Sequence, residues 1–351
     1  MACVLLGLGV FSQAAAADKL YVVERERGRL AVVEEGRLSR EIPGLGNLNH
    51  ATVKFLKGFA YVISRDGRLS RVDLSQDRVV ETARVGESGI GLTFVGDAVA
   101  VANYDPPSVV VVDQQLKPLT TIETGSRNVG IQSRGNLLVF SLMDKDQVWV
   151  ADANQDFQVV SRVPVGQMPF DAMLAGHSYL IGFFEDASIG VLDLESGSYR
   201  THDLTPGGET LLKIPHFGLW GKASQAVYVP GVKQRCLHVL DLPDLTYRAR
   251  VELQGNPVFA VVAPGGQFLA VNYSGDREDF VSIVDLRTLQ IVRELEAGRR
   301  VMHLRFSADG ERLYLTSYRD NKLKIFETRG WSLTETVDVP GPSGIFLVPA
   351  E

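Results

Sequence analysis

The sequence has little cysteine, no membrane-length apolar run and none of the short motifs that mark nucleotide or protease chemistry. Only Cys3 and Cys236 occur among its 351 residues, which excludes a disulfide framework, so the fold must rest on its apolar core. No C-x-x-C-H is present, which excludes a covalently attached c-type haem. The Walker loop, H-E-x-x-H, G-x-S-x-G and the dinucleotide fingerprint are also absent, which disfavours nucleotide-driven and protease chemistry.

An excess of positive charge is also missing. The 36 Lys and Arg residues are outnumbered by 42 Asp and Glu residues, for a net charge of −6. This balance argues against a nucleic-acid or anionic-membrane partner. The N-terminal apolar run is too short to span a membrane, and its alanines resemble the cleavage site of a secretory signal. We expect residues 1–17 to be a signal peptide, cleaved near Ala16 or Ala17, with no transmembrane segment.

What the sequence does contain is a repeat. Residues 301–328 form one unit, in which the runs MHLRF, RLYLTS and KLKIFE are separated by the turn-forming stretches S-A-D-G and Y-R-D-N. A run that ends in an acidic residue recurs eight times, at Glu35, Asp73, Asp113, Asp152, Asp193, Asp241, Asp285 and Glu327. The separations of 38 to 48 residues are typical of β-propeller blades.

A second set of eight runs indicates how the ring closes. These are the first strands of the blades, and they begin near His50, Ile90, Val129, Phe170, His216, Val258, Met302 and Ser343. The last of them has no further strands after it, while the chain after residue 17 begins with three strands and lacks a first one. We therefore predict an all-β, eight-bladed β-propeller over residues 18–351, in which the C-terminal strand completes the N-terminal blade.

This architecture predicts where a binding site lies. First strands line the central channel, and the loops before them share one face with the loops between second and third strands. His50, His216 and His303 fall at the starts of first strands, in the first, fifth and seventh blades, so His50 and His216 are expected to face each other. Opposed imidazoles suit metal ligation or proton transfer. The alternative is that each histidine only packs in its strand.

The loops between second and third strands add cations and aromatic rings to the same opening. Guanidinium forks and aromatic faces suit a flat, apolar ligand that carries several carboxylates. The alternative is that these arginines are solvated turn residues paired with neighbouring acids; Arg127 has no acid adjacent in the sequence. The candidates are Arg25, Arg65, Arg127, Arg277, Arg319, Tyr104, Phe183, Tyr273 and Tyr318. We interpret His177, His202, His238 and Cys236 as structural.

Several longer stretches resemble a known family. They include GLGNLNHATVKF (44–55), SRDGRLSRVDL (64–74), VANYDP (101–106), PHFGLWG (215–221), VMHLRF (301–306) and PSGIF (342–346). Together they resemble the NirF family of haem d1 biosynthesis proteins and, more distantly, the d1-haem propeller of cytochrome cd1 nitrite reductase. The resemblance implies a periplasmic propeller of denitrifying bacteria. It would bind haem d1 or a dihydro-haem d1 precursor, an iron tetrapyrrole, in its central funnel.

The resemblance also implies roles for individual residues. The important histidine of the family corresponds to His50. We expect His50 to ligate the iron or to transfer protons beside it. His216 is expected on the opposite side of the channel, as the second catalytic residue. The remaining expected cofactor-binding residues are Arg65, Tyr104, Arg127, Tyr273, His303 and Arg319. Expected partners are cytochrome cd1 nitrite reductase and other d1-haem biosynthesis proteins.

The reaction stays open at this point. Side-chain modification of the macrocycle, its oxidation, and simple carriage are each compatible with the resemblance, and a non-catalytic protein-docking platform is a further alternative. The related dehydrogenase and nitrite reductase need a c-type haem domain, which the missing C-x-x-C-H argues against. A metal-dependent lactonase propeller needs a carboxylate-rich calcium site, whereas the first strands of this chain offer imidazole and guanidinium groups.

Overall fold

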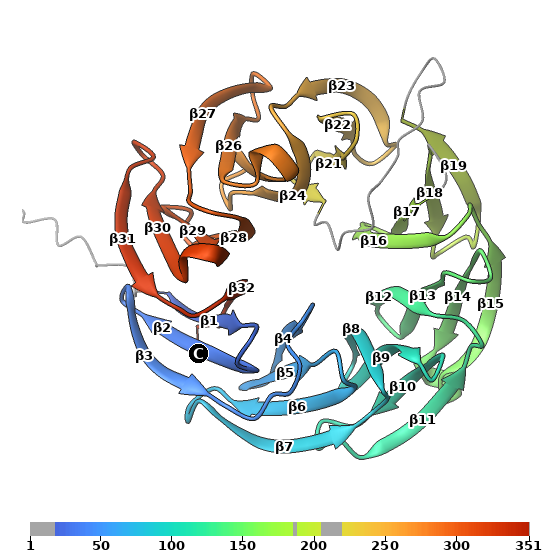
Figure 1. Ribbon diagram of the computed structural model, residues 1–351. Coiled ribbons are helices and arrows are strands. Elements are labelled where there is room, and N and C mark those ends of the chain that lie inside the picture. Colours follow the sequence, from blue (N-terminus) through green and yellow to red (C-terminus); the bar gives the residue numbers. More distant parts are fainter. Residues whose placement is uncertain (1–17, 185–187, 205–219, 351) are drawn as a thin grey trace, which may run out of the picture.

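The computed structural model of the chain describes residues 18–184, 188–204 and 220–350, which form a ring of antiparallel sheets around a central channel (Figure 1). These residues contain eight sheets of four strands each. The prediction of an all-β, eight-bladed propeller is therefore confirmed. We number the blades by their innermost strands, from the blade of β4 (first) to the blade of β32 (eighth).

Each blade runs from an innermost strand at the channel to an outermost strand at the rim of the ring. In this order the eighth blade holds β32 (Pro342–Leu347), β1 (Lys19–Glu24), β2 (Arg29–Glu34) and β3 (Arg37–Ile42). The first holds β4 (Thr52–Leu56), β5 (Phe59–Ile63), β6 (Arg68–Asp73) and β7 (Arg78–Arg84). The second holds β8 (Ser88–Val95), β9 (Ala98–Asp105), β10 (Ser108–Val112) and β11 (Pro118–Glu123). The third holds β12 (Asn128–Arg134), β13 (Leu137–Leu142), β14 (Gln147–Asp152) and β15 (Gln158–Pro164).

The remaining blades follow the same order. The fourth holds β16 (Pro169–Ala175), β17 (Ser178–Phe183), β18 (Ser188–Asp193) and β19 (Tyr199–Asp203). The fifth holds β20 (Gly221–Lys222), β21 (Ala226–Gly231), β22 (Cys236–Asp241) and β23 (Thr246–Glu252). The sixth holds β24 (Asn256–Val262), β25 (Phe268–Ser274), β26 (Phe280–Asp285) and β27 (Gln290–Glu296). The seventh holds β28 (Val301–Phe306), β29 (Arg312–Ser317), β30 (Lys322–Glu327) and β31 (Leu333–Asp338). Three short 3₁₀ turns lie at Ala153–Gln155, Gly275–Arg277 and Tyr318–Asp320.

The acidic residue that ends most third strands has a structural role. The carboxylate of Asp193 accepts hydrogen bonds from the backbone N–H groups of Glu195 and Ser196 at 2.9 and 2.8 Å. Asp285 does the same for Arg287 and Thr288, each at 2.9 Å. These bonds start the turn into the outer strand, and those to Asp193 help to lower its pKa to about 2. The acidic repeat in the sequence is therefore a turn signal rather than a row of binding groups.

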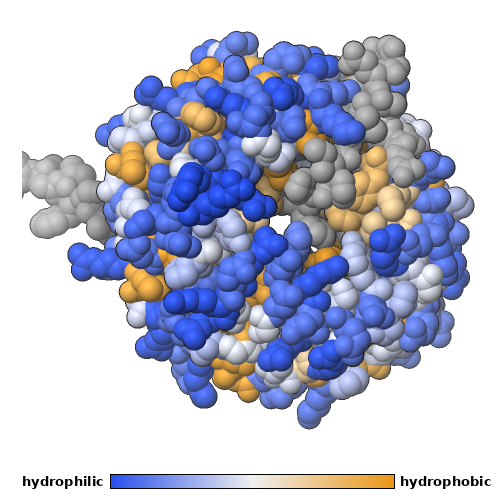
Figure 2. Space-filling view, viewed as in Figure 1, coloured by the Kyte–Doolittle hydropathy of each residue, from blue (hydrophilic) through white to orange (hydrophobic). Residues whose placement is uncertain are grey.

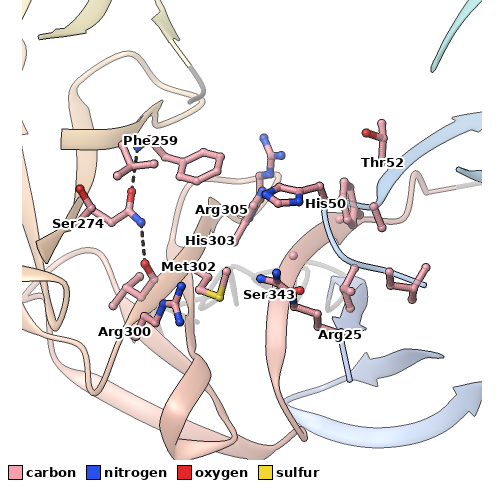
Figure 3. Close-up of a pocket in the computed structure, with 18 of the residues that line it drawn as sticks. Arg25, His50, Thr52, Phe259, Ser274, Arg300, Met302, His303, Arg305 and Ser343 are labelled. Atoms are coloured by element: carbon pink, nitrogen blue, oxygen red, sulfur yellow. Dashed lines mark hydrogen bonds between the residues drawn. The ribbon is translucent and has the colours of Figure 1, made fainter. Parts of the chain in front are cut away.

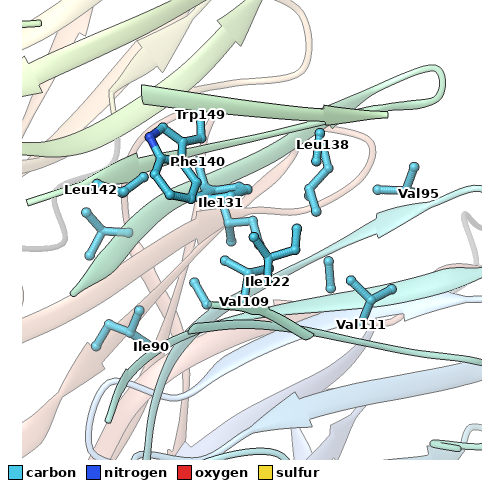
Figure 4. Close-up of a cluster of buried hydrophobic side chains, with 14 of the residues drawn as sticks. Ile90, Val95, Val109, Val111, Ile122, Ile131, Leu138, Phe140, Leu142 and Trp149 are labelled. Carbon is cyan, nitrogen blue, oxygen red and sulfur yellow. The ribbon is translucent and has the colours of Figure 1, made fainter. Parts of the chain in front are cut away.

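The core lies between adjacent blades. In one cluster, shown in Figure 4, Val109 and Val111 of the second blade and Leu138 and Phe140 of the third are fully buried together with the largely buried Trp149. Burial of each such side chain contributes roughly 1.5–3 kcal/mol relative to leaving it in water. Since every blade is packed on two neighbours, the channel wall is held rigidly.

Ring closure joins the two ends of the described chain. Strand β32 pairs with β1, placing Ile345 opposite Val22 and Leu347 opposite Leu20, as the sequence predicted. The predicted signal peptide (1–17) and His216 lie outside the described residues. Among the residues that the structure does describe, no helix has the length and apolar character needed to cross a membrane.

Candidate ligand-binding site

Bulges in the innermost strands direct side chains into the channel. In β28 two residues, Met302 and His303, lie opposite the single residue Thr316 of β29, because the register shifts between Val301 and Leu304. The Thr316 hydroxyl accepts a hydrogen bond from the His303 backbone N–H at 2.8 Å and so replaces the lost ladder bond. An extra residue re-aims its side chain, and His303 lines the channel cavity.

The sixth blade repeats this device. The register of β24 shifts between Pro257 and Ala260, and the side chain of Asn272 accepts a hydrogen bond from the backbone N–H of Phe259 at 2.9 Å. Phe259 is therefore the positional equivalent of His303. The two rings lie 5.2 Å apart between centroids, so two neighbouring blades together form one wall of the cavity.

The cavity has a volume of about 620 Å³, within the range that suits a drug-sized or cofactor-sized ligand. Its lining comes from the sixth, seventh, eighth and first blades, with Ile90 from the second. In Figure 3, Phe259 on one side and His50 on the other point toward the centre, where His303 and Arg305 also lie. Figure 2 shows that hydrophilic residues gather around the central opening on the face in view.

His303 is held between two aromatic rings and lacks a partner for one nitrogen. Its ring centroid lies 5.2 Å from that of Phe259 and 5.9 Å from that of Phe346. The Nδ1 atom is buried and has no hydrogen-bond partner among the described residues. Burial, with a smaller contribution from Arg305, lowers the pKa of His303 to about 3. The imidazole is therefore neutral near pH 7, which is the form that ligates a metal.

His50 lies at the mouth of the same cavity. It is exposed and precedes β4, with its backbone in the left-handed region at φ 61°. Fifteen described residues other than glycine share this region, so the conformation marks a tight turn before β4. The fully buried side chains of Leu45 and Leu48 anchor the loop, and the amide oxygen of Asn49 accepts a hydrogen bond from Arg25. Arg25 also lines the cavity.

The lining carries a large excess of positive charge. Its described residues include four cations and a single carboxylate: Arg25, Lys54, Arg300, Arg305 and Glu278. In a chain of net charge −6, this local balance has the opposite sign to the whole. Cations concentrated in a partly enclosed space attract and hold anionic ligands.

Neither Tyr273 nor Arg319 is placed to hold a ligand directly. Tyr273 lines the cavity, but it is 2% exposed and its hydroxyl donates to Ser282 at 2.5 Å, so it backs the wall. Arg319 is not among the lining residues; it forms an ion pair with Glu278 at 2.8 Å between Nη1 and Oε1. Arg319 therefore neutralises the one carboxylate of the lining.

Arg65, Tyr104 and Arg127 form a separate group that does not line this cavity. The Tyr104 ring contacts both guanidinium groups, with the Cζ atoms of Arg65 and Arg127 at 4.8 and 5.8 Å from its centroid. Arg127 lacks an acidic neighbour in the sequence but has one in space. Its Nη2 lies 2.6 Å from Oδ1 of Asp144, and its backbone N–H also donates to that carboxylate, at 2.8 Å.

Several lining residues were not selected from the sequence. Lys54, Phe259, Arg300, Arg305 and Phe346 all contact the cavity. The sequence does indicate that Arg305 faces the channel. Alternate residues of a strand share one face, and Arg305 lies two positions after His303. No such signal exists for Phe259, whose orientation depends on a bulge. Among the described residues, no group of three or more His, Cys, Asp or Glu side chains could hold a metal ion.

The buried histidines predict an acid-sensitive fold. Burial lowers the pKa of His238 to about 4, and that of His303 to about 3, from an ordinary value of 6.5. The unfolded chain therefore binds more protons below pH 6.5, and the free energy of unfolding falls as the pH drops from 6.5 toward 4. The expected slope is up to about 1.4 kcal/mol per pH unit for each histidine.

Urea unfolding of the wild type and of His303→Phe between pH 7.5 and 4.5 measures this slope. We expect His303→Phe to reduce the slope of the free energy of unfolding against pH by about half of the part that His238 and His303 contribute together. Met302→Phe, a change at the neighbouring residue of the same bulge, should leave the slope unaltered. Equal slopes in the wild type and His303→Phe would show that His303 does not stay neutral in the folded protein.

The chain is related over nearly its whole length to known proteins. The cytochrome D1 heme domain family matches residues 15–350. The chain belongs to this family. Protein NirF of Stutzerimonas stutzeri is 32% identical to it over 352 residues, which cover 93% of this chain and 90% of NirF. Protein NirF of Pseudomonas aeruginosa is 30% identical, with the same coverage. The resemblance to NirF that the motifs indicated is confirmed.

Solved structures show the same fold. The dihydro-heme d1 dehydrogenase NirN, in complex with DHE, superposes with a TM-score of 0.82 at 21% identity, covering 95% of this chain and 76% of NirN. Apo AztD from Citrobacter koseri gives a TM-score of 0.74 at 14% identity, with coverage of 95% and 98%. At these identities the likeness establishes the architecture, and the site must be argued from its own residues.

Proposed function

We propose that this protein binds haem d1 or a late tetrapyrrole precursor in the channel cavity and takes part in its conversion for cytochrome cd1 nitrite reductase, in the periplasm. Membership of the cytochrome D1 heme domain family and the relationship to NirF support a role in haem d1 biosynthesis. The observation that carries the binding proposal is the lining of the cavity. It combines aromatic walls, a neutral imidazole with an unpartnered nitrogen, and four cations against one carboxylate.

The residues present fit such a ligand. A tetrapyrrole is flat and apolar on its faces and carries carboxylates at its edge, so it needs aromatic walls and cationic groups around them. Phe259 and Phe346 supply the walls, and the lining cations face the same space. Nδ1 of His303 is buried and has no hydrogen-bond partner within residues 18–184, 188–204 and 220–350. When bound, the ligand would supply an iron centre and a redox-active macrocycle.

The two described histidines of the cavity suit different tasks. His303 is enclosed and neutral, which suits it to hold a metal-bearing ligand in place. His50 is exposed at the mouth, where an imidazole can exchange protons with solvent, which suits acid–base work on the bound ligand. This division modifies the expectation that His50 is the metal ligand.

An optical titration of the purified protein with haem d1 tests the binding proposal. We expect a saturable shift of the Soret and red bands, because the His303 imidazole would hold the iron and Phe259 and Phe346 would enclose the macrocycle in apolar surroundings. His303→Leu is expected to change the position of the shifted bands. His177→Leu, which replaces an exposed histidine paired with Asp193, is expected to behave as the wild type.

A flat titration of the wild type would overturn tetrapyrrole binding and leave the fold in place. The docking-platform alternative would then be favoured, provided that the protein still retains nitrite reductase or another biosynthesis protein in a pulldown.

A further inference from the structure

Two of the cations in the cavity have no counter-ion among the residues that the structure describes. Lys54 lies on β4 and Arg305 on β28, the innermost strands of the first and seventh blades, and both line the cavity. Neither forms a hydrogen bond or an ion pair with any residue that the structure describes. Both side chains are half-buried, so each cation still faces the space that a ligand would occupy.

This situation differs from that of the arginines nearer the surface. Arg319 is paired with Glu278 and Arg127 with Asp144, so those cations are already neutralised by the protein. A half-buried cation without a carboxylate partner costs some folding free energy. Groups that are unfavourable for stability in this way are typical of sites where the missing partner is a ligand.

The strand geometry brings Lys54 and Arg305 to one compartment. Strand β32 of the eighth blade lies between β4 and β28 in the ring (Figure 1). It contributes Ser343 and Gly344 to the lining, and a Cβ at Gly344 would lie 3.1 Å from side-chain atoms of Phe346 and Val23, a tight contact that they would have to relieve by moving.

Arg305 is also tied to the histidine of the site. It lies two residues after His303 on β28, so the two side chains share one face of the strand. Figure 3 shows Arg305 and His303 in the central part of the cavity, on the side toward which Phe259 and His50 point. An anion bound by Arg305 would therefore belong to a molecule that also contacts His303.

We propose that Lys54 and Arg305 form a carboxylate-binding subsite that fixes the orientation of the ligand in the channel. Arg305 offers a planar fork that can hold a carboxylate through two parallel hydrogen bonds, and Lys54 adds a compact charge from the other side. The subsite rests on the proposed function, since the carboxylate is that of the tetrapyrrole edge. It selects the edge that enters the channel, and so determines which side chains of the macrocycle remain near His50.

Binding of the free acid and of its methyl ester separates this role from a general effect on the cavity. We expect Lys54→Met and Arg305→Met each to weaken binding of free-acid haem d1 by about 10- to 100-fold, the range of a lost charge-assisted hydrogen bond. Binding of the carboxyl methyl ester should be unchanged by either substitution. Lys57→Met, at the exposed turn after β4, and Arg293→Met, on the outer strand β27, serve as controls and should match the wild type.

Thermal stability provides a second measurement that also guards against misfolded variants. Because the two cations are unpaired, both methionine variants should unfold at or above the wild-type temperature, whereas loss of a structural ion pair would lower it. Wild-type affinity for the free acid in both variants would overturn the subsite. An equal loss for acid and ester would do so as well, since it would indicate a change of shape.

Acetate distinguishes a failure of the subsite from a failure of the proposed function. Millimolar acetate should raise the unfolding temperature of the wild type but not that of the Lys54→Met/Arg305→Met double variant. If the wild type binds no tetrapyrrole yet shows this acetate effect, Lys54 and Arg305 do bind a free carboxylate, and only the proposed function fails. If acetate stabilises both proteins equally and the variants bind haem d1 normally, the subsite is wrong and the proposed function stands.

Discussion

Deletion of residues 342–351 is expected to reduce the free energy of unfolding by on the order of 5 kcal/mol. The deleted segment contains β32, which supplies the ladder partner of β1 and the fully buried side chain of Ile345. It also packs against β28 of the neighbouring blade. Without it the eighth blade has three strands and β1 becomes an open edge. Single domains have a total stability of about 5–15 kcal/mol, so this loss is enough to unfold a marginal protein.

Urea unfolding followed by circular dichroism measures the effect, and a circular permutant provides the control. The backbone N–H of Val348 donates to the carbonyl of Lys19 at 2.9 Å, so the end of β32 lies beside the start of β1. A chain in which residues 341–351 precede Asp18 through a short linker keeps every strand and replaces ring closure by a hairpin. It should be about as stable as the wild type. A deletion variant that retained wild-type stability would show that ring closure contributes little.

The fold could be predicted from the sequence because its signals are local and repeated. At Asp73, Asp193 and Asp285 the acidic side chain accepts hydrogen bonds from the backbone N–H groups two and three residues later. Because these bonds are made within the turn itself, the signal recurs in most copies whatever packs around it. Even ring closure follows from counting strands, because the chain has one innermost strand left over at its end.

The site was predicted only in part, because it depends on geometry that one sequence does not reveal. The bulges that aim Phe259 and His303 into the channel are visible only in the register of the strands. The partner of Arg127 is Asp144, which lies in another loop. The loop arginines therefore looked available although Arg127, Arg277 and Arg319 are paired with carboxylates. Lys54 and Arg305, by contrast, looked like ordinary strand residues. The sequence-predicted residues His50, Tyr273 and His303 line the cavity, whereas Arg65, Arg127 and Arg319 lie outside its lining.

Replacement of His50 is expected to abolish maturation of haem d1 without unfolding the protein. The side chain is exposed and the buried Leu45 and Leu48 anchor its loop, so removal of the imidazole creates no cavity in the core. Loss of an acid–base group costs about 100- to 10,000-fold in rate. Cells that carry the variant as their only copy should accordingly show at least about 100-fold less active cytochrome cd1 nitrite reductase.

The choice of substitution decides whether this result is interpretable. The backbone of His50 is left-handed, a conformation that asparagine tolerates and alanine does not. His50→Asn therefore removes the imidazole and keeps the loop, whereas His50→Ala adds backbone strain. If the imidazole is the active group, both variants lose maturation equally, and both still bind haem d1 in the optical titration because His303 and the lining cations remain. Normal maturation in His50→Asn together with loss in His50→Ala would assign the effect to the loop conformation, and His50 would have no chemical role.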